Sequence, residues 1–223
     1  MENPKLIIVN APEGALEIVN RAARTCYRSM DKDHPETREN FIKGIIKSGH
    51  ESVLEHCEVN FELSNISRAC ATQILRHRIA SYSCESMRYV KMLNYSYITP
   101  GAVEANAEAL RTFNKAVNAA KKAYAVLLDM GIKAEDARAC LPIATCTRMF
   151  FSMNFRAIRH FLKERMSPRA QREVRMVALS MYEQIQSLYP WLVEDLTGLY
   201  ESGLNKVKTE VPAPLPGSDL GGK

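Results

Sequence analysis

The order of apolar and polar positions predicts strands and helices in alternation along the chain. An apolar run at 5–9 predicts a first strand, and strict alternation over 57–63 predicts a half-buried antiparallel strand with one polar face. Strand-forming residues at 145–153 predict another strand, and a shorter one is predicted at 95–99. These patterns predict both strands and helices, with at least one strand in antiparallel pairing.

Apolar residues at helical spacing predict the helices. A long amphipathic helix is predicted over 103–130 with Gly131 as its C-cap, and another from the Asn154 cap to about 166. The other helices are predicted at 16–26, about 36–48, 69–75, 134–140 and from a Ser167-Pro168 start to 188. The length of the helix at 103–130 suggests packing against another subunit.

Length and composition favour one folded domain. With 223 residues, 46% of them hydrophobic, the chain can bury a substantial core, which we place at 1–203. Because the composition turns to Lys, Pro and Gly after Gly203, we expect 204–223 to be a disordered tail. No apolar run approaches the roughly 18 residues of a membrane span. The start at 1–5 is too polar for a secretion signal, so we expect a cytoplasmic protein without membrane contact.

Positively charged residues concentrate in one short segment. The net charge is a modest +5, but 17 arginines and 13 lysines make up the 30 basic residues. Arginine presents a planar fork of donors that matches phosphate or carboxylate oxygens, which favours discrete anion sites over a diffuse polyanion surface. The segment 76–89 is the densest and contains Arg76, His77, Arg78, Glu85, Ser86 and Arg88. We interpret it as an anion receptor.

Two more arginines stand among apolar residues. Arg165 follows Ile158 by seven positions and so projects from the apolar stripe of its helix. It either meets an anion or extends to solvent at the helix end, where a cation also suits the helix dipole. Arg138 offers the same choice between an anion site and a surface position. Basic residues at 156, 159 and 160 support a second cluster near Arg165.

Several kinds of site lack their sequence patterns. The six cysteines contain no CxxC pair, and the spacing of His50 and His56 is not a metal motif, so we expect no metal site. Neither GxGxxG nor GxxxxGK[ST] is present, so a bound nucleotide or flavin must be held by side chains and helix ends. Cys84 is either a reactive thiol or a small residue that lines a pocket.

The spacing in the basic segment resembles a known signature. Arg76-His77-Arg78, seven residues and then Ser86 is similar to the RHRx7S motif of the flavin-dependent thymidylate synthases, the ThyX family. The resemblance extends from about residue 5 to about residue 200. Further similar segments are Ser48-Gly49-His50-Glu51-Ser52 with Glu55-His56, Arg138 with Leu141-Pro142, Thr147 to Phe151, Asn154-Phe155-Arg156, and His160 with Leu162 and Arg165.

The resemblance implies an activity and a set of site residues. It implies an α+β fold of the ThyX type, a mostly antiparallel sheet flanked by helices with one long helix. It implies conversion of dUMP to dTMP in a homotetramer with FAD at subunit interfaces, methylenetetrahydrofolate as carbon donor and NADPH as reductant. It implies cofactor binding by Ser52, Arg76, His77, Arg78, Cys84, Asn154, Arg156 and His160. It implies dUMP binding by Gln73, Arg76, Glu85, Ser86, Arg88, Arg138 and Arg165. It implies catalytic roles for Arg165, Ser86 and His50, with His50 close to the flavin.

One departure from the family pattern concerns Cys84. Many members have Asn-Glu after the Ser-Tyr pair, whereas this chain has Ser83-Cys84, with a glutamate one position later at Glu85. The contact of that first glutamate is therefore not carried over, and Cys84 has only a backbone group to offer in its place.

The chemistry explains why such a site needs arginines. Methylation at C5 of uracil builds negative charge near O4 and N3, which a guanidinium such as that of Arg165 would stabilise. Ser86 lacks a committed base, so we interpret it as a residue that positions dUMP. The alternative is an Arg-rich nucleic-acid-binding module in which tyrosines of the basic segment stack on bases. The low net charge argues against it, so we expect no nucleic-acid partner.

Overall fold

A four-stranded antiparallel sheet forms the centre of the computed structural model, which describes residues 3–93 and 95–210. The strand order is β1-β2-β4-β3, and the α+β fold predicted from the sequence is confirmed. The strands are β1 (Lys5–Asn10), β2 (Glu58–Ser67), β3 (Ser81–Cys84) and β4 (Cys146–Asn154).

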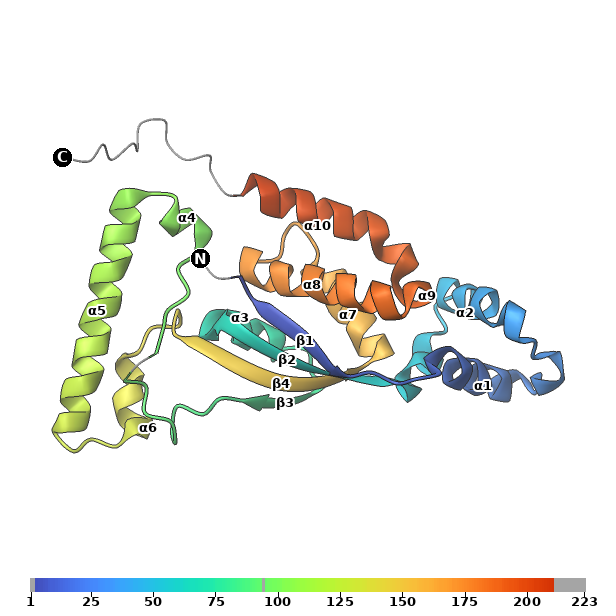
Figure 1. Ribbon diagram of the computed structural model, residues 1–223, viewed down its shortest axis with the longest axis horizontal. Coiled ribbons are helices and arrows are strands. Elements are labelled where there is room, and N and C mark those ends of the chain that lie inside the picture. Colours follow the sequence, from blue (N-terminus) through green and yellow to red (C-terminus); the bar gives the residue numbers. More distant parts are fainter. Residues whose placement is uncertain (1–2, 94, 211–223) are drawn as a thin grey trace.

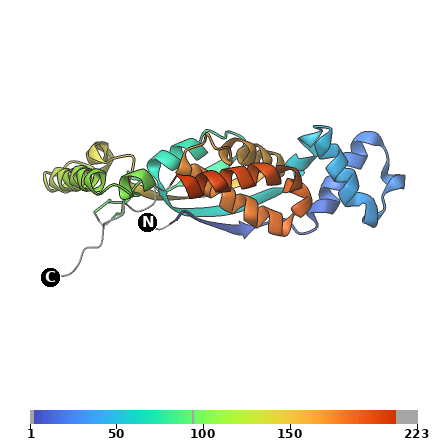
Figure 2. The same cartoon turned by 90° about the horizontal axis from the view of Figure 1, so that it is seen from above.

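Helices cover one face of this sheet and extend the molecule at both ends. The α7, α8 and α10 helices lie over the sheet, α1 and α2 form one end, and α5 and α6 form the other (Figures 1 and 2). The α-helices are α1 (Ala15–Tyr27), α2 (Arg38–Lys47), α3 (Arg68–Ile74), α4 (Gly101–Glu104), α5 (Ala107–Asp129), α6 (Ala134–Ala137), α7 (Phe155–Arg165), α8 (Arg172–Leu188), α9 (Pro190–Val193) and α10 (Thr197–Thr209). The 3-10 turns are η1 (Met30–Lys32), η2 (Pro35–Thr37), η3 (Glu51–His56), η4 (Arg138–Cys140) and η5 (Glu194–Leu196).

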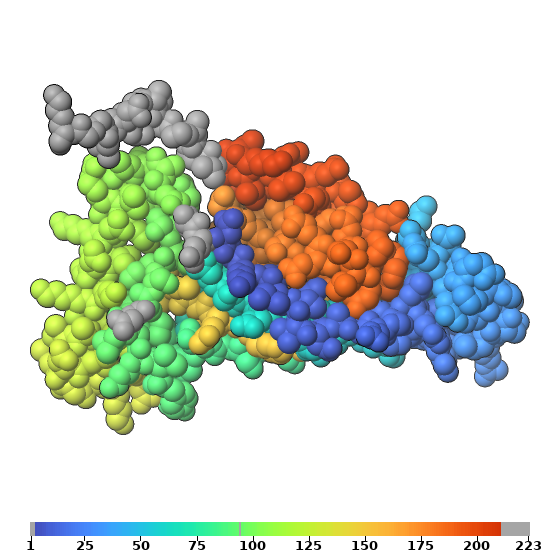
Figure 3. All heavy atoms as spheres, in the orientation of Figure 1, coloured from blue at the N-terminus to red at the C-terminus, as the bar shows by residue number. Residues whose placement is uncertain are grey.

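Alternation along the two central strands builds the core. In β2, Val59, Phe61 and Leu63 are fully buried beneath the helices. Phe61 stacks on Phe151 of β4, with ring centroids 5.0 Å apart. The opposite face of the sheet retains exposed apolar side chains, such as Phe150 at 42% exposure. The sheet is therefore covered on one side, as expected for an antiparallel sheet. Figure 3 shows the blue and green ends projecting on either side of the orange and red helices.

Two predicted elements differ from the structure. The long helix predicted at 103–130 is broken into α4 and α5, because the side chain of Asn106 accepts hydrogen bonds from Glu108 N and Ala109 N, both at 3.0 Å. Asn106 thus starts a new helix as its N-cap. The strand predicted at 95–99 is reduced to an isolated bridge between Tyr97 and Thr145.

The prediction that Ser167-Pro168 starts a helix is wrong. The α8 helix begins at Arg172, and Arg175 of its first turn reaches back to the preceding segment. The Arg175 guanidinium donates to Ser167 O at 3.3 Å, to Pro168 O at 3.2 Å and to Ala170 O. These bonds hold the segment as a separate turn, so a further helix does not start until it ends.

The boundary expected at Gly203 also differs from the structure. Helix α10 continues to Thr209, and Gly203 is buried inside it. A side chain at this position would collide with the carbonyl oxygen of Met166, so the glycine permits close packing rather than ending the ordered chain. The rest of the predicted tail, 211–223, lies outside the described residues.

The described residues contain neither a candidate membrane span nor a candidate metal cluster. No helix there is both long and apolar enough to cross a membrane. The same part of the chain contains no group of three His, Cys, Asp or Glu side chains placed to hold a metal ion.

Candidate active site

The turn between α3 and β3 carries the Arg-His-Arg sequence. Ser67 caps α3, with its hydroxyl accepting from Cys70 N at 3.0 Å. After α3 ends, the hydroxyl of Tyr82 lies 3.0 Å from Ile74 O and 2.8 Å from His77 O. Burial raises the pKa of Tyr82 to about 12, so the hydroxyl keeps the proton with which it holds this turn. Tyr82 therefore fixes the backbone that presents the motif.

A cavity of about 520 Å³ joins this motif to helix α7. Six of the eight predicted cofactor-binding residues line it. They are Arg76, His77 and Arg78 from the motif and Asn154, Arg156 and His160 from the start of α7. Two segments about 80 positions apart in the sequence thus form one basic cavity.

The start of α7 is set by its cap. Asn154 ends β4 and accepts a hydrogen bond from Ala157 N at 2.8 Å, which is the predicted N-cap geometry. Arg156, His160 and Lys163 follow at helical spacing and all line the cavity. One face of α7 is therefore the basic wall of the cavity, while Ile158 and Leu162 on another face are buried.

His77 and Arg165 form a direct contact at the edge of this cavity. Arg165 Nε donates to His77 Nε2 at 2.9 Å, and Arg165 Nη2 lies 3.4 Å from Gln73 O. Burial and the neighbouring Arg165 lower the pKa of His77 from 6.5 to about 4, so the ring is neutral at physiological pH. Because a guanidinium only donates, Nε2 is the acceptor and the proton of the neutral ring is on Nδ1.

That Nδ1 has no partner among the described residues, although it is buried. An N–H group in this position needs an acceptor, because an unpaired buried donor is costly. Since His77 lines the cavity, a bound group with a carbonyl oxygen would supply the acceptor. The cavity thus offers cations for phosphates and a ring N–H for a carbonyl, a donor set that fits a flavin nucleotide.

The predicted substrate residues Arg88 and Arg138 meet at a different place, around Glu135. Arg88 binds the Glu135 carboxylate at 2.9 and 2.7 Å, and Arg138 Nε donates to Glu135 O at 3.0 Å. Arg88 holds the pKa of Glu135 below its usual range. Glu135 is on α6, at the end of the molecule far from α7 in both views (Figures 1 and 2). Within one chain, the predicted substrate residues are therefore divided between two places.

Glu85, Ser86 and Cys84 lie along the segment between these two places. Arg68 Nη2 donates to Glu85 O at 2.7 Å, and the Glu85 carboxylate lies 3.7 Å from Arg148 Nε. The Ser86 hydroxyl accepts from Arg88 N at 3.2 Å. Cys84 is half-buried and does not line the cavity; burial raises the pKa of its thiol, so it is not activated as a nucleophile.

His50 and Ser52 are not among the residues that line the cavity. His50 precedes η3, and its Nδ1 is 2.9 Å from the Tyr27 hydroxyl. Ser52 is exposed on η3, next to Glu51, which does line the cavity. His50 and Ser52 are thus sequence neighbours of Glu51, which lines the cavity, but neither of them lines it within one chain.

Sequence reasoning missed several residues of the site. Glu51, Ile79, Ala157 and Lys163 complete the cavity lining. Lys163 follows Arg156 by seven positions, a spacing that could have predicted it. Tyr82 and Glu135 gave no comparable signal, because their partners do not lie at a regular helical spacing from them.

Comparisons with known proteins identify a family. A family model described as "Thymidylate synthase complementing protein" matches residues 7–191. The chain belongs to this family. Curated members of similar sequence are named flavin-dependent thymidylate synthase.

Two of these family members and one solved structure give the extent of the similarity. The Geobacter sulfurreducens protein is 39% identical over 194 residues, 82% of each chain. The Mycolicibacterium vanbaalenii protein is 36% identical over 200 residues, 82% of this chain and 80% of its own. The UMP/dUMP methylase PolB from Streptomyces cacaoi, solved with 5-Br dUMP, superposes with a TM-score of 0.77 at 26% identity. The superposition covers 89% of the present chain and 96% of PolB.

Proposed function

We propose that this protein is a flavin-dependent thymidylate synthase that converts dUMP to dTMP. The cavity that joins Arg76, His77 and Arg78 to the basic face of α7 supports this proposal most directly. FAD is the proposed cofactor, methylenetetrahydrofolate the carbon donor and NADPH the reductant. We find no support for the nucleic-acid-binding alternative in the family match.

The proposed cofactor residues divide by the groups they would bind. Arg76, Arg78 and Arg156 would pair with the pyrophosphate of FAD, because guanidinium forks match phosphate oxygens. The Nδ1–H of His77 would donate to a carbonyl of the flavin ring. Bound flavin supplies hydride transfer, and the protein supplies binding, orientation and electrostatics.

Arg165 would act on the uracil ring. Its Nε is committed to His77, while a terminal nitrogen makes only a 3.4 Å contact with Gln73 O. The guanidinium therefore has donors left for the O4 and N3 region, where negative charge develops during methylation at C5. Fixed by His77 in a partly buried position, it would stabilise that charge without rearranging.

Ser86, Arg88 and Arg138 would hold the nucleotide. Arg88 and Arg138 are both anchored on Glu135, which places two guanidinium groups near each other for the phosphate of dUMP. Because this pair is distant from α7 in the same chain, we propose that a complete site combines two subunits of a homotetramer. The sparsely buried α5, with Val117 and Tyr124 as its buried residues, is available for subunit contacts. We place the enzyme in the cytoplasm.

Purified protein tests the activity directly. The wild-type chain should be isolated with flavin absorbance, or acquire it with FAD. It should form dTMP from dUMP only when methylenetetrahydrofolate and NADPH are both present, as measured by chromatography. Colourless protein that does not take up FAD would contradict the proposal.

The role of Ser86 has its own test. Ser86→Ala should raise the KM for dUMP and leave flavin reduction by NADPH unchanged, because Ser86 is proposed to position the nucleotide. If the variant bound dUMP and its flavin were reduced normally while turnover was abolished, Ser86 would be required for the chemistry instead.

A further inference from the structure

Lys163 stands in the cofactor cavity although the family signature does not include it. It lies one turn beyond His160 and two turns beyond Arg156, on the face of α7 that lines the cavity. At 1.5 Å per residue, the cations at 156 and 163 are separated by about 10 Å along the helix. The basic wall is therefore long enough to meet an extended dinucleotide at more than one point.

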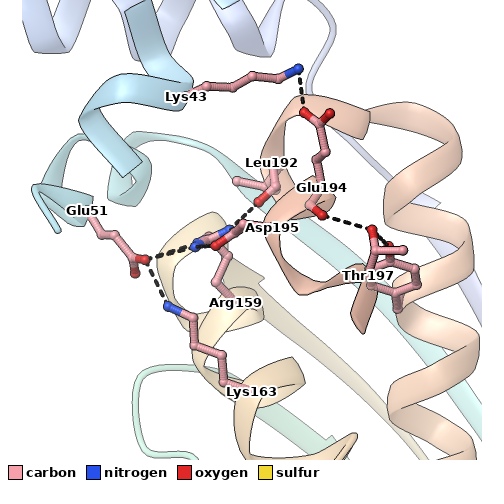
Figure 4. A network of polar contacts seen from close by, with 9 residues as sticks. Lys43, Glu51, Arg159, Lys163, Leu192, Glu194, Asp195 and Thr197 are labelled. Atoms are coloured by element: carbon pink, nitrogen blue, oxygen red, sulfur yellow. Dashed lines mark hydrogen bonds and ion pairs between the residues drawn. The ribbon is translucent and has the colours of Figure 1, made fainter. Parts of the chain in front are cut away.

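The lysine is held in place by Glu51. Lys163 Nζ lies 3.0 Å from Glu51 Oε1, and the lysine side chain is 43% exposed (Figure 4). Glu51 lines the same cavity and is 16% exposed. The ammonium group is thus directed to a defined place at the cavity wall and can still be reached by a ligand.

Lys163 is not the only cation that contacts Glu51 among the described residues. The same Oε1 accepts from Arg159 Nε at 3.1 Å, and Arg159 is almost fully buried, with a 1% exposed side chain. Arg159 is itself fixed by both oxygens of Asp195, at 2.7 and 2.8 Å (Figure 4). An ion pair as exposed as Glu51–Lys163 contributes little to folding, so structural need does not account for Lys163.

The charges of the cavity point to an anionic ligand group. Arg76, Arg78, Arg156 and Lys163 are positive, and Glu51 is the sole acid among the lining residues that the structure describes. The remaining excess of three positive charges is more than enough to balance the two negative charges of a pyrophosphate. Lys163 increases this excess at the end of the wall farthest from the Asn154 cap.

We propose that Lys163 binds the phosphate groups of the flavin cofactor, positioned for this by the Glu51–Arg159–Asp195 chain of contacts. The inference rests on the proposed binding of FAD in this cavity. Lys163 thereby adds a contact to the proposed cofactor site. The arginines of the motif and at the start of α7 cannot make this contact, because Lys163 lies two helical turns beyond Arg156.

Cofactor affinity tests this role without measuring turnover. Enzyme freed of flavin is titrated with FAD and with riboflavin, which lacks phosphates, and binding is followed by flavin fluorescence. Lys163→Met should weaken FAD binding about tenfold, as expected for one lost charge-assisted contact. Lys163→Arg, which keeps the charge, should remain within about threefold of wild type. Riboflavin binding should not change in either variant.

A matched control is available on α10. Lys206 has a 45% exposed side chain and an ion pair with Glu210 at 3.8 Å, so Lys206→Met removes a similar exposed lysine outside the cavity. This control should bind FAD like wild type. In a separate measurement, added salt should weaken FAD binding by the wild-type protein more than FAD binding by Lys163→Met.

Three results would overturn the proposals, and they are distinguishable. Wild-type FAD affinity in Lys163→Met would refute the role of Lys163 alone. Equal losses of FAD and riboflavin affinity would show that Lys163 does not act on the phosphates. Failure of the wild-type protein to bind any flavin would refute the proposed function itself.

Discussion

Replacement of Arg159 by methionine should lower the stability of the protein substantially. The Arg159 guanidinium joins three segments by contacting Glu51 after α2, Asp195 in η5 and the carbonyl oxygen of Leu192 in α9 (Figure 4). Arg159→Met would leave the partly buried Glu51 carboxylate and the Leu192 carbonyl without this donor. Methionine fills a similar volume, so the effect reports the lost polar contacts rather than a large cavity.

The expected loss follows from the burial of the partners. Breaking a buried ion pair from one side costs about 3–5 kcal/mol. Because the Asp195 side chain is 51% exposed, water can compensate part of its charge, and we expect about 3 kcal/mol. That is a large fraction of the roughly 5–15 kcal/mol by which folded proteins are stable. With a urea dependence of about 2–3 kcal/mol per molar, the unfolding midpoint should fall by roughly 1 M.

Urea unfolding followed by far-ultraviolet circular dichroism at one protein concentration provides the assay. Lys163→Met is the control, since it removes an exposed partner of the same Glu51 and should cost less than about 1 kcal/mol. If Arg159→Met unfolded at the wild-type midpoint at pH 7, the buried contacts would not be stabilising and the reasoning would be refuted.

Acid provides a second check on the same contacts. Hydrogen bonds and charges from Lys163 and Arg159 lower the pKa of Glu51 despite its burial, and those of Arg159 lower the pKa of Asp195. Carboxylates with a lowered folded-state pKa stabilise the protein above their unfolded pKa, and this stability is lost as the pH falls through the folded value. The difference between wild type and Arg159→Met should therefore shrink in acid.

Three further predictions concern the candidate site. Arg165→Ala should retain flavin but reduce dTMP formation about 100- to 1000-fold, because a donor for the developing charge is lost; near-normal turnover would refute this role of Arg165. Asn154→Ala should lower the free energy of unfolding by about 1 kcal/mol, or roughly 2–4 °C in melting temperature, and Asn154→Ser should restore most of this loss. An unchanged melting temperature in Asn154→Ala would mean that the 2.8 Å cap contributes nothing to stability. His77, with a pKa lowered from 6.5 to about 4, is neutral when folded, so its contribution to stability should be lost as the pH falls from about 6.5 to 4. An NMR titration that showed His77 gaining its proton near pH 6.5 would contradict this.

Periodicity in the sequence was sufficient to predict most of the fold. The alternation at 57–63 and the Asn154 cap correspond to β2 and to the start of α7. Errors arose where a polar side chain acted on the backbone of its neighbours, as Asn106 does in ending one helix and starting another. The pattern of apolar positions does not show where Asn106 interrupts the helix, since one long helix and two shorter helices would bury the same residues.

The candidate site was predictable where it depends on local spacing. Six predicted cofactor residues line one cavity, because the motif and the α7 face each have a recognisable pattern. Lys163 shares the α7 pattern, but Glu135 and Tyr82 act through partners more than four positions away in the sequence. Such contacts depend on how the backbone folds, and no repeating pattern in the sequence shows them.

The packing of α10 limits how far the chain can be shortened from its C-terminal side. Arg175 is buried, with a 1% exposed side chain, and its charge is met by Glu210, just beyond the end of α10, at 2.8 Å. The same guanidinium binds the 167–170 carbonyls, and that turn leads directly to Gln171, which receives a hydrogen bond from Gln73 beside the motif. A chain ended at Gly203 would leave Arg175 without its carboxylate and loosen the support of the motif from behind. Affinity tags and truncations therefore belong after Glu210, where they leave this support intact.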